Sequence, residues 1–246
     1  MSDSVTWPRC RCIRDEPGVA LIVVLMAMSV MSALGLALML TTMAERKIAG
    51  SFERGTEAFY GADAGIERAM VDLLRLPSWD GALTGTVTST FIDGGPDGVR
   101  AGPGQLPFDL SEATSLVRCG KPACSDADLV AITEERPWGS NNPAWQPFAY
   151  GPLDQLLPDQ RINSHIYVVV WVADDPSEND GDPRRDGGLP VGCDPARDPG
   201  CQDRNLGRGV LLMKAKAFGP DGTQRAIEVT VKRTDLPRIV SWREAD

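Results

Sequence analysis

The hydrophobic pattern of the chain is dominated by one uncharged apolar run close to the N-terminus, residues 19–40. At about 1.5 Å of rise per residue, a helix over this run is about 33 Å long, enough to cross a bilayer core of about 30 Å. The run is apolar on every face, which a soluble domain accommodates only deep inside a large core. The pattern therefore predicts a single transmembrane helix.

The helical pattern continues beyond the apolar run. No proline follows until Pro77, whereas a secretory signal peptide has a shorter apolar part that ends at a small-residue cleavage site. We expect one helix over residues 19–77, with an amphipathic second half that packs on a downstream domain. The apolar residues that continue at spacings of three, four or seven are Ile48, Phe52, Phe59, Ala62, Ile66, Met70 and Leu73.

Residues 78–246 are long enough to form one domain with its own core. The segment GPDG at 219–222 lies between two alternating runs and predicts a β-hairpin. A helix followed by strands predicts an α+β fold, with an antiparallel sheet lying on the amphipathic part of the helix. The expected strands are residues 86–92, 129–133, 165–173, 209–218, 225–232 and 238–242.

Two segments rich in Gly and Pro, residues 91–110 and 136–158, are typical of long loops. The second carries four aromatic residues, which either form an exposed site for a partner or fold back to cap the core. We expect them to cap the core. These residues are Trp138, Trp145, Phe148 and Tyr150.

The residues around the apolar run resemble a known family. EPG at 16–18 is followed by VALIVVL, and LGLALMLTTMAERKIAGSFERGTEAFYGADAGIERAM occupies residues 34–70. This string is similar to the N-terminal region of PilX-type minor pilins of type IV pili. The resemblance implies a pilin-like fold: a leader at residues 1–18, a long helix at 19–77 that crosses the membrane at 19–40, and a globular β-rich head at 78–246.

In that family a prepilin peptidase cuts after the glycine, here Gly18, and the new N-terminal residue, here Val19, is N-methylated. A plain alternative is that Gly18 is an N-cap or turn residue before a helix. Charges on the two flanks of the apolar run do not settle its orientation. The resemblance implies that the leader lies in the cytoplasm and the head outside, in the periplasm.

The sequence departs from the usual pilin pattern at the fifth residue of the mature chain, which is Val23 where most pilins have Glu. A carboxylate there can pair with the amino terminus of a neighbouring subunit inside an apolar fibre, and this pairing directs docking. Its absence suggests a subunit at a fibre tip or in an initiating complex. Alternatively, Val is tolerated there without positional meaning.

The resemblance implies a minor pilin that takes part in starting, assembling or capping a type IV pilus, and thereby in twitching motility and adhesion. The implied partners are other minor pilins, the major pilin, the inner-membrane assembly platform, the prepilin peptidase and a tip adhesin. The protein would be stored in the inner membrane before it enters the fibre. The alternatives are a tip pseudopilin of a type II secretion system and a single-pass, membrane-anchored calcium-binding module.

Six cysteines divide between two regions of the chain. Cys10 and Cys12 lie in the expected leader, and four lie in the head that the resemblance places outside the cytoplasm. An even count in an exported segment fits two disulfides, and close spacing favours the pairs 119 with 124 and 193 with 201. Cross-pairing and a zinc site stay open, although the spacings lack the usual zinc-knuckle pattern. The head cysteines are Cys119, Cys124, Cys193 and Cys201.

The segment DDPSENDGDPRRDGG at 174–188 concentrates carboxylates between turn-forming residues. Calcium requires six to eight oxygen ligands from a compact loop. Positions 1, 3, 5, 7 and 12 of an EF-hand-like frame fall on Asp175, Ser177, Asn179, Gly181 and Asp186, although position 6 is Asp rather than Gly and the flanks are not helical. The segment is therefore either a calcium loop of another type or a solvated acidic loop.

The sequence offers little for catalysis. His165, the one histidine, precedes an apolar strand, where a structural role is commoner than that of a general base, and no phosphate-binding loop or redox CxxC motif occurs. The net charge of -9 argues against nucleic-acid binding, and the basic pair Arg184 and Arg185 lies among acidic residues. We expect no enzyme activity and no cofactor other than the calcium considered above.

Overall fold

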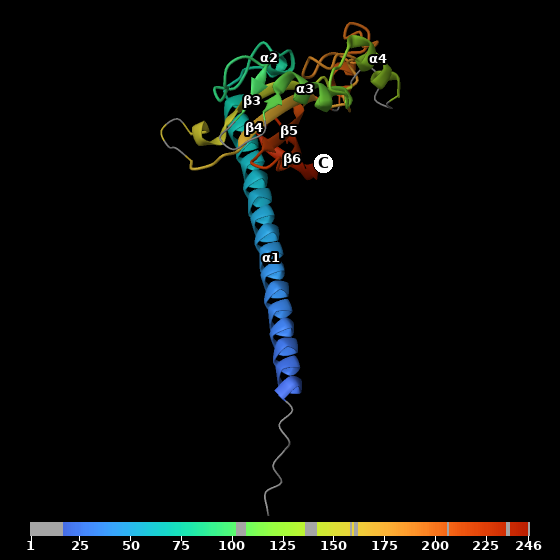
Figure 1. The fold of residues 1–246 in the computed structure, drawn as a ribbon. Helices are drawn as coiled ribbons and strands as arrows, with labels where there is room; N and C mark the ends of the chain where they lie inside the picture. Colours follow the sequence, from blue (N-terminus) through green and yellow to red (C-terminus); the bar gives the residue numbers. More distant parts are fainter. Residues whose placement is uncertain are drawn as a thin grey trace, which may run out of the picture. The chain divides into compact units, whose positions relative to one another are not determined.

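The structure, a computed structural model, describes residues 17–101, 107–135, 142–157, 159, 162–205, 207–234 and 237–245. The chain forms two compact units, Met1–Gly50 and Ser51–Asp246. Most of the expected leader, with Cys10 and Cys12, lies outside the described residues, as does Trp138. In chain order the elements are α1 (Pro17–Leu73), α2 (Asp80–Leu83), β1 (Val99–Arg100), β2 (Phe108–Asp109), α3 (Leu110–Cys119), α4 (Asp126–Glu135), β3 (Gln146–Pro152), β4 (Tyr167–Asp174), β5 (Val210–Phe218), β6 (Gln224–Lys232) and β7 (Arg238–Ala245), with short 3-10 helices at Leu153–Gln155 and Cys201–Arg204 (Figure 1).

The second unit is built on a five-stranded antiparallel sheet with strand order β3-β4-β5-β6-β7. The β5–β6 hairpin turns at Asp221 and Gly222, whose φ angles of 54° and 74° are those of a type I′ turn. The N–H of Thr223 donates to the carbonyl of Pro220 at 3.0 Å and closes the turn. The hairpin that GPDG predicts is therefore confirmed.

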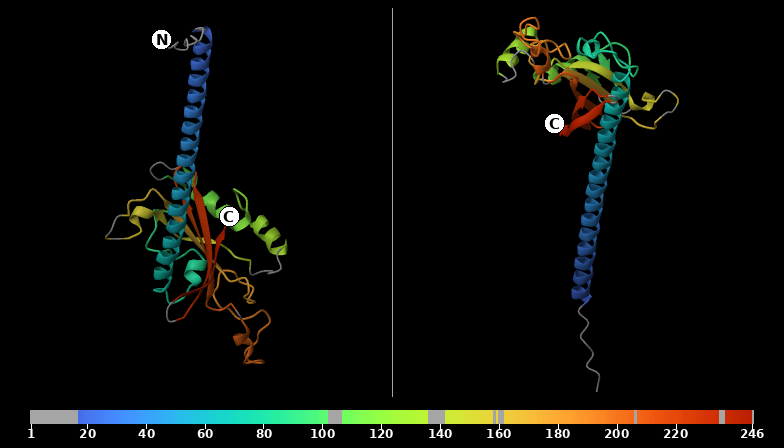
Figure 2. Two further views of the ribbon diagram at one scale, coloured as in Figure 1. Left: turned by 90° about the horizontal axis from the view of Figure 1, so that it is seen from below. Right: turned by 180° about the vertical axis from the view of Figure 1, so that it is seen from behind.

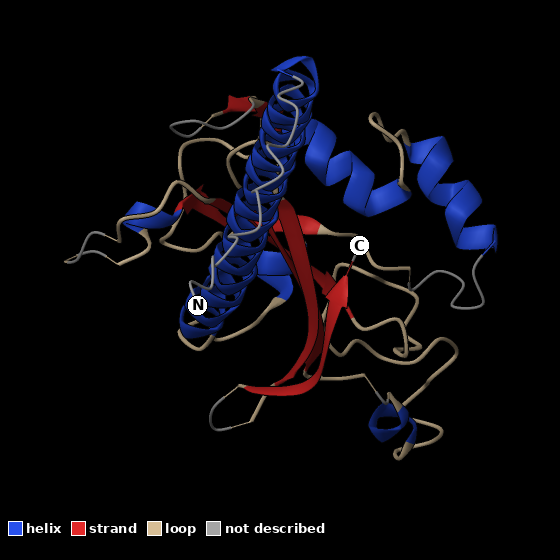
Figure 3. Ribbon diagram, turned by 60° about the horizontal axis from the view of Figure 1, so that its bottom comes forward, coloured by secondary structure: helices blue, strands red, loops and turns tan. Residues whose placement is uncertain are grey.

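Strand β4 lies at the centre of two hydrophobic layers, because every one of its residues is buried. Val168, Val170 and Val172 belong to the core that the sheet shares with the C-terminal part of α1. Tyr167, Val169 and Trp171 belong to a second cluster that the sheet shares with α3. The sheet is therefore covered by α1 on one face and by α3 on the other, and both helices are seen against it in Figure 3.

Small residues on α1 allow the helix to lie close to the sheet. Ala58, Ala62 and Ala69 are fully buried there. A Cβ added at Gly65 would lie 2.5 Å from a methyl carbon of Val168, and one added at Gly61 would lie 3.0 Å from a methyl carbon of Ile166. The contact at Gly65 is not sterically allowed without movement, whereas the one at Gly61 is tight. Gly65 therefore limits the distance between α1 and β4.

The predicted apolar stripe of α1 is confirmed over its C-terminal part only. Ala62, Ile66 and Leu73 are buried, and Phe59 and Met70 are half-buried against the same core. Ile48 and Phe52, the first two residues of the stripe, are exposed. In the structure, the sheet therefore covers the stripe only beyond Phe52.

Asp72 fastens the end of α1 to the segment that follows α2. Its Oδ2 accepts hydrogen bonds from the Ser89 hydroxyl at 2.5 Å and from the N–H and hydroxyl of Thr90 at 2.9 Å each. Burial raises the pKa of Asp72, but these hydrogen bonds and the Arg68 guanidinium outweigh it and hold the pKa below its ordinary value of 3.8. The carboxylate is therefore charged at neutral pH, and its Oδ2 is well satisfied.

Three sequence predictions about the head are wrong. Residues 86–92 form bends and irregular backbone with one isolated bridge between Ile92 and Tyr150, and residues 129–133 lie in helix α4. The segment 136–158, predicted to be a loop, contains β3, the edge strand of the five-stranded sheet, and Pro147 and Pro152 are tolerated there because a strand at an edge has a full strand partner on one side only. A short apolar run is compatible with either a helix or a strand. Prolines are usually taken as loop signals, so a proline-containing edge strand is not predicted from the sequence.

The same segment does cap the core as predicted. Phe148 and Tyr150 are 1% exposed and Trp145 is 7% exposed. Phe148 joins the α1 side of the sheet, whereas Trp145 and Tyr150 join the α3 side. The fold is accordingly α+β and pilin-like, as predicted, with a long N-terminal apolar helix and an antiparallel sheet.

The substitution Gly65→Ala should destabilise the second unit, because its methyl group overlaps Val168. Overpacking costs about 1–3 kcal/mol, and the gain in helix propensity of about 1 kcal/mol offsets only part of it. In Gly55→Ala, the new methyl group meets only the flexible end of Arg225 at 3.3 Å, so this control should be neutral or stabilising. Thermal unfolding of the full chain in detergent tests both, and equal melting temperatures would contradict the packing argument.

The substitution Asp72→Asn should lower the free energy of unfolding by about 1–2 kcal/mol at pH 7, because it replaces charged hydrogen bonds with neutral ones. Since the pKa of Asp72 is depressed in the folded state, its contribution is present above pH 4 and is lost as the pH falls through the folded-state pKa. The difference from wild type should therefore shrink below pH 4 in denaturant titrations. Glu67→Gln, at an exposed position on the same helix, is the control and should show no such trend.

Candidate functional site

Among the residues that the structure describes, one helix is long and apolar enough to cross a membrane, and it covers Gly18–Leu73. In its N-terminal part the large apolar side chains are exposed on all sides, with Met31 at 73% and Leu38 at 70%. Such a surface is not stable in water, since burying apolar area is the main favourable term in folding. By its length and composition, this segment fits membrane anchoring.

The hydroxyl groups of this helix are satisfied internally. Ser29, Ser32, Thr41 and Thr42 each donate to a backbone carbonyl three or four residues earlier, at 2.7 to 2.8 Å. Helical Ser and Thr make this bond readily. In lipid, where no water is present to accept the hydrogen bond, it removes the penalty for an unsatisfied polar group.

The predicted cleavage residues lie at the start of α1. The helix begins at Pro17, a favourable first helical residue, so Gly18 and Val19 lie in its first turn rather than at an N-cap. A Cβ at Gly18 would meet no atom within 4 Å. Val23 is 59% exposed, and no charged residue follows until Glu45. Cleavage after Gly18 stays a prediction.

The acidic segment forms the first part of the long connection between β4 and β5, drawn in orange at one end of the sheet in Figure 2. Of the five residues in the predicted calcium frame, the structure brings only Asp186 into a cluster of carboxylates. The Asp175 carboxylate accepts the N–H of Ser177 at 3.0 Å in a local turn. The Asn179 carbonyl accepts the N–H of Val191 at 2.8 Å.

The carboxylate cluster consists of Asp174, Glu178 and Asp186, each of which offers one oxygen within 4.8 Å of the others. Asp174 is the last residue of β4, and the other two lie in the connection that follows. Asp174 is 0% exposed, Glu178 is 3% exposed, and the Asp186 side chain is 7% exposed. The sequence frame misses Asp174 and Glu178, although a carboxylate that ends an otherwise apolar strand is a signal that identifies the first of them.

The three carboxylates differ in how they are satisfied. Glu178 Oε2 accepts the N–H of Gly187 at 3.1 Å and the side-chain amide of Asn205 at 2.9 Å. Asp186 Oδ1 accepts the N–H of Gly209 at 2.6 Å. Neither oxygen of Asp174 accepts a hydrogen bond of acceptable geometry from any residue that the structure describes. Asp174 is therefore the one carboxylate of the three for which neither oxygen has a hydrogen-bond partner among the described residues.

The pKa values of the cluster reflect this crowding. Burial raises the pKa of Asp174 strongly, and the negative charge of Glu178 raises it further, while the nearby backbone N–H of Asp175 lowers it only in part. Burial also raises the pKa values of Glu178 and Asp186. Without a positive partner, three such groups do not all hold their charge.

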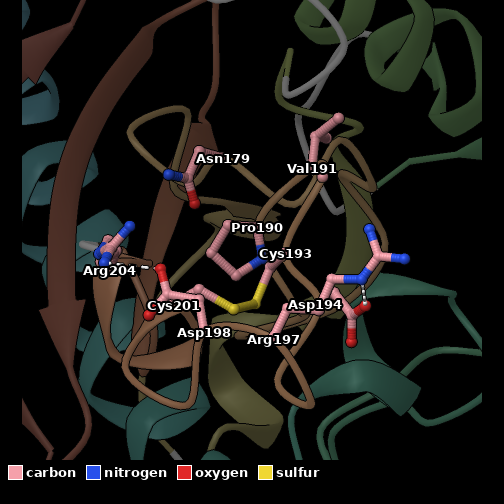
Figure 4. Close-up of a pocket in the computed structure, with 10 residues that line it drawn as sticks. Asn179, Pro190, Val191, Cys193, Asp194, Arg197, Asp198, Cys201 and Arg204 are labelled. Carbon is pink, nitrogen blue, oxygen red and sulfur yellow. Dashed lines mark ion pairs between the residues drawn. A yellow bond between two sulfur atoms is a disulfide. The ribbon is translucent and has the colours of Figure 1, made fainter.

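The cysteines of the head are joined as Cys119 with Cys124 and Cys193 with Cys201, the pairs that close spacing favours. The second disulfide lies at the centre of a shallow pocket in the β4–β5 connection (Figure 4). On the rim of this pocket, Arg197 pairs with Asp194 at 3.2 Å and Arg204 with Asp198 at 2.8 Å. The disulfide and these ion pairs brace the connection locally.

His165 lies two residues before the start of β4 and is exposed. The carboxylate cluster, in the connection that follows the other end of this strand, consists of hard oxygen donors, which suit Ca²⁺ or Mg²⁺. The cluster is therefore a set of donors that suits a hard cation.

Residues 18–67 match the family model described as PilX N-terminal. No curated protein matches the chain, and no solved structure does. The chain therefore carries a PilX-type pilin N-terminal region, as its residues predict. In general terms this supports a minor pilin related to type IV pili. The PilX family is a family of structural pilin components and not an enzyme family.

Proposed function

We propose that this protein is a minor pilin that helps to start or cap a type IV pilus. The observation that supports the proposal most directly is the long helix α1, which has two parts that differ in exposure and which matches the PilX N-terminal family model over residues 18–67. Its first part is apolar and exposed on every face, whereas its second part supplies buried residues to the head. Such a helix serves first as a membrane anchor and later as a packing element in a fibre.

Val23 supports a place at the tip or in the initiating complex. A mature pilin that carries a carboxylate at its fifth position can pair it with the amine of a neighbouring subunit, and burying that charge without a partner costs several kcal/mol. Val23 has no charge to pair. This subunit therefore has no electrostatic requirement for an earlier subunit, which suits the first position in a fibre.

The proposed orientation places residues 1–18 in the cytoplasm and the head in the periplasm, from which the protein enters the fibre. The two disulfides of the head fit an oxidising compartment. The proposed partners are other minor pilins, the major pilin, the inner-membrane assembly platform, the prepilin peptidase and a tip adhesin. Helix packing through small residues such as Gly35, where a Cβ would meet no atom within 4 Å in the single chain, suits such partners.

Deletion of the gene should abolish or strongly reduce surface pili and twitching motility, while type II secretion stays intact. Electron microscopy, motility plates and assay of a secreted enzyme measure the three properties. Complementation with the wild-type gene should restore pili. Loss of secretion with normal pili would instead identify a tip pseudopilin, and no change in either system would contradict the proposal.

Coexpression of the full chain with a prepilin peptidase should remove residues 1–18 and leave N-methylated Val19 as the first residue, because the small Gly18 suits a protease subsite. Mass spectrometry of the intact protein and of its N-terminal peptide measures both changes. Gly18→Arg should block cleavage, whereas Gly35→Ala, a glycine change in the same helix, should not. Cleavage of the Gly18 variant, or no cleavage of the wild type, would show that this glycine is not the processing site.

A further inference from the structure

The carboxylate cluster at the end of β4 is the place where the described part of the chain concentrates the most unbalanced buried charge. Asp174, Glu178 and Asp186 each offer an oxygen within 4.8 Å of the others. Asp180 adds negative charge close to Asp174 and Glu178, and Asp80 adds it close to Asp186. Burying several like charges together is unfavourable unless opposite charge neutralises them.

Among the residues that the structure describes, two arginines act on Asp186. The Arg233 guanidinium lies 4.0 Å from Asp186 Oδ2, and Arg208 also acts on Asp186. Arg233 is itself held by the carbonyls of Leu76 and Pro77, at 2.9 and 2.6 Å. The side-chain charges that act most strongly on Asp174 are those of Glu178, Asp186 and Asp180.

Asp174 supplies a second, independent observation. Its side chain is completely buried, and neither of its oxygens accepts a hydrogen bond of acceptable geometry from the described residues. Buried polar atoms in native proteins are paired in the large majority of cases. Because this carboxylate points into a group of other carboxylates, the partner that satisfies all of them at once is a cation.

A fourth oxygen lies in the same neighbourhood. Asn205 is buried, and its side-chain amide donates to Glu178 Oε2 at 2.9 Å and to the carbonyl of Gly188 at 3.1 Å. Its Oδ1 is buried and has no hydrogen-bond partner among the described residues. The site therefore offers three carboxylates, and Asn205, which contacts one of them, has a buried amide oxygen without a partner among the described residues.

This donor set favours calcium over magnesium. Ca²⁺ takes six to eight oxygen ligands in flexible geometry, including bidentate carboxylates and backbone carbonyls, whereas Mg²⁺ demands a small octahedron and keeps several waters. Three buried carboxylates on a loop rich in turns match the first description. We propose that Asp174, Glu178 and Asp186, with Asn205 as a further oxygen donor, bind one Ca²⁺ that fixes the β4–β5 connection to the end of strand β4.

The consequence is a head whose stability depends on calcium. The backbone N–H of Asp186 donates to Asp80 Oδ1 at 2.9 Å, so the same connection also contacts α2. A bound cation would therefore link β4, the connection and α2 within one unit. This proposal does not depend on the pilus function and can fail or hold separately from it.

The test uses the full chain in detergent, freed of metal with EDTA and then titrated with CaCl2 by calorimetry and thermal unfolding. Wild type should bind about one Ca²⁺ per chain, and its melting temperature should rise by about 5 °C at a hundredfold excess over Kd. Asp174→Asn and Glu178→Gln should each weaken binding at least about tenfold, as losses in metal sites typically do. Asp175→Asn, one residue from the cluster with its carboxylate held in a local turn, should bind as wild type does.

The variants also separate loss of binding from loss of folding. In EDTA, Asp174→Asn should be at least as stable as wild type, because it removes a buried charge that has no partner. The absence of heat and of a melting shift in wild type at millimolar Ca²⁺ would overturn the proposal. So would equal loss of binding in Asp175→Asn and Asp174→Asn, and tighter binding of Mg²⁺ than of Ca²⁺ would overturn the choice of metal.

Discussion

The contact between the small-residue face of α1 and the valines of β4 is the constraint on which the head depends. Gly65 lies so close to Val168 that no larger residue fits without movement, and Ala58, Ala62 and Ala69 extend the same face. Glycine lowers helix stability by up to about 1 kcal/mol relative to alanine, so the helix gives up local stability for close packing. Because α3 buries the other face of β4, the position of α1 fixes the strand that both halves of the core share.

The parts of this fold that the sequence predicts are those in which one simple pattern decides the outcome. Strand β4 is buried on both faces, and this produces the continuous apolar run at 166–173. Strands β5 and β6 alternate, and Asp221 and Gly222 carry the positive φ angles of their turn. The long helix follows from an apolar run and a stripe without an intervening proline. In each case the local signal and the tertiary environment agree.

The parts that the sequence does not predict are those in which tertiary contacts decide. Strand β3 contains Pro147 and Pro152, and it forms a strand through its pairing with β4 and the burial of its side chains. Helix α3 begins inside a loop-like segment, where the Asp109 carboxylate caps it by accepting the N–H of Ser111 at 2.8 Å. The EF-hand frame identifies ligands by their spacing along the chain, whereas the carboxylates that lie together in the structure are not at that spacing. In the sequence, Asp174 is recognisable only as the last residue of a strand. In the structure, its carboxylate lies in the cluster with Glu178 and Asp186.

The length of the β4–β5 connection explains why it needs attachments. A segment of this length with little regular structure is uncommon in a compact domain unless it is functional or held by cross-links. Here the Cys193–Cys201 disulfide closes its later part, and hydrogen bonds and an ion pair join Asp186 to Asp80, Gly209 and Arg233. Its earlier part contributes to the buried cluster of Asp174, Glu178 and Asp186, whose like charges repel one another. A solvated acidic loop would spread these charges into water, whereas this fold concentrates them at the end of β4, where the Ca²⁺ that we propose would neutralise them.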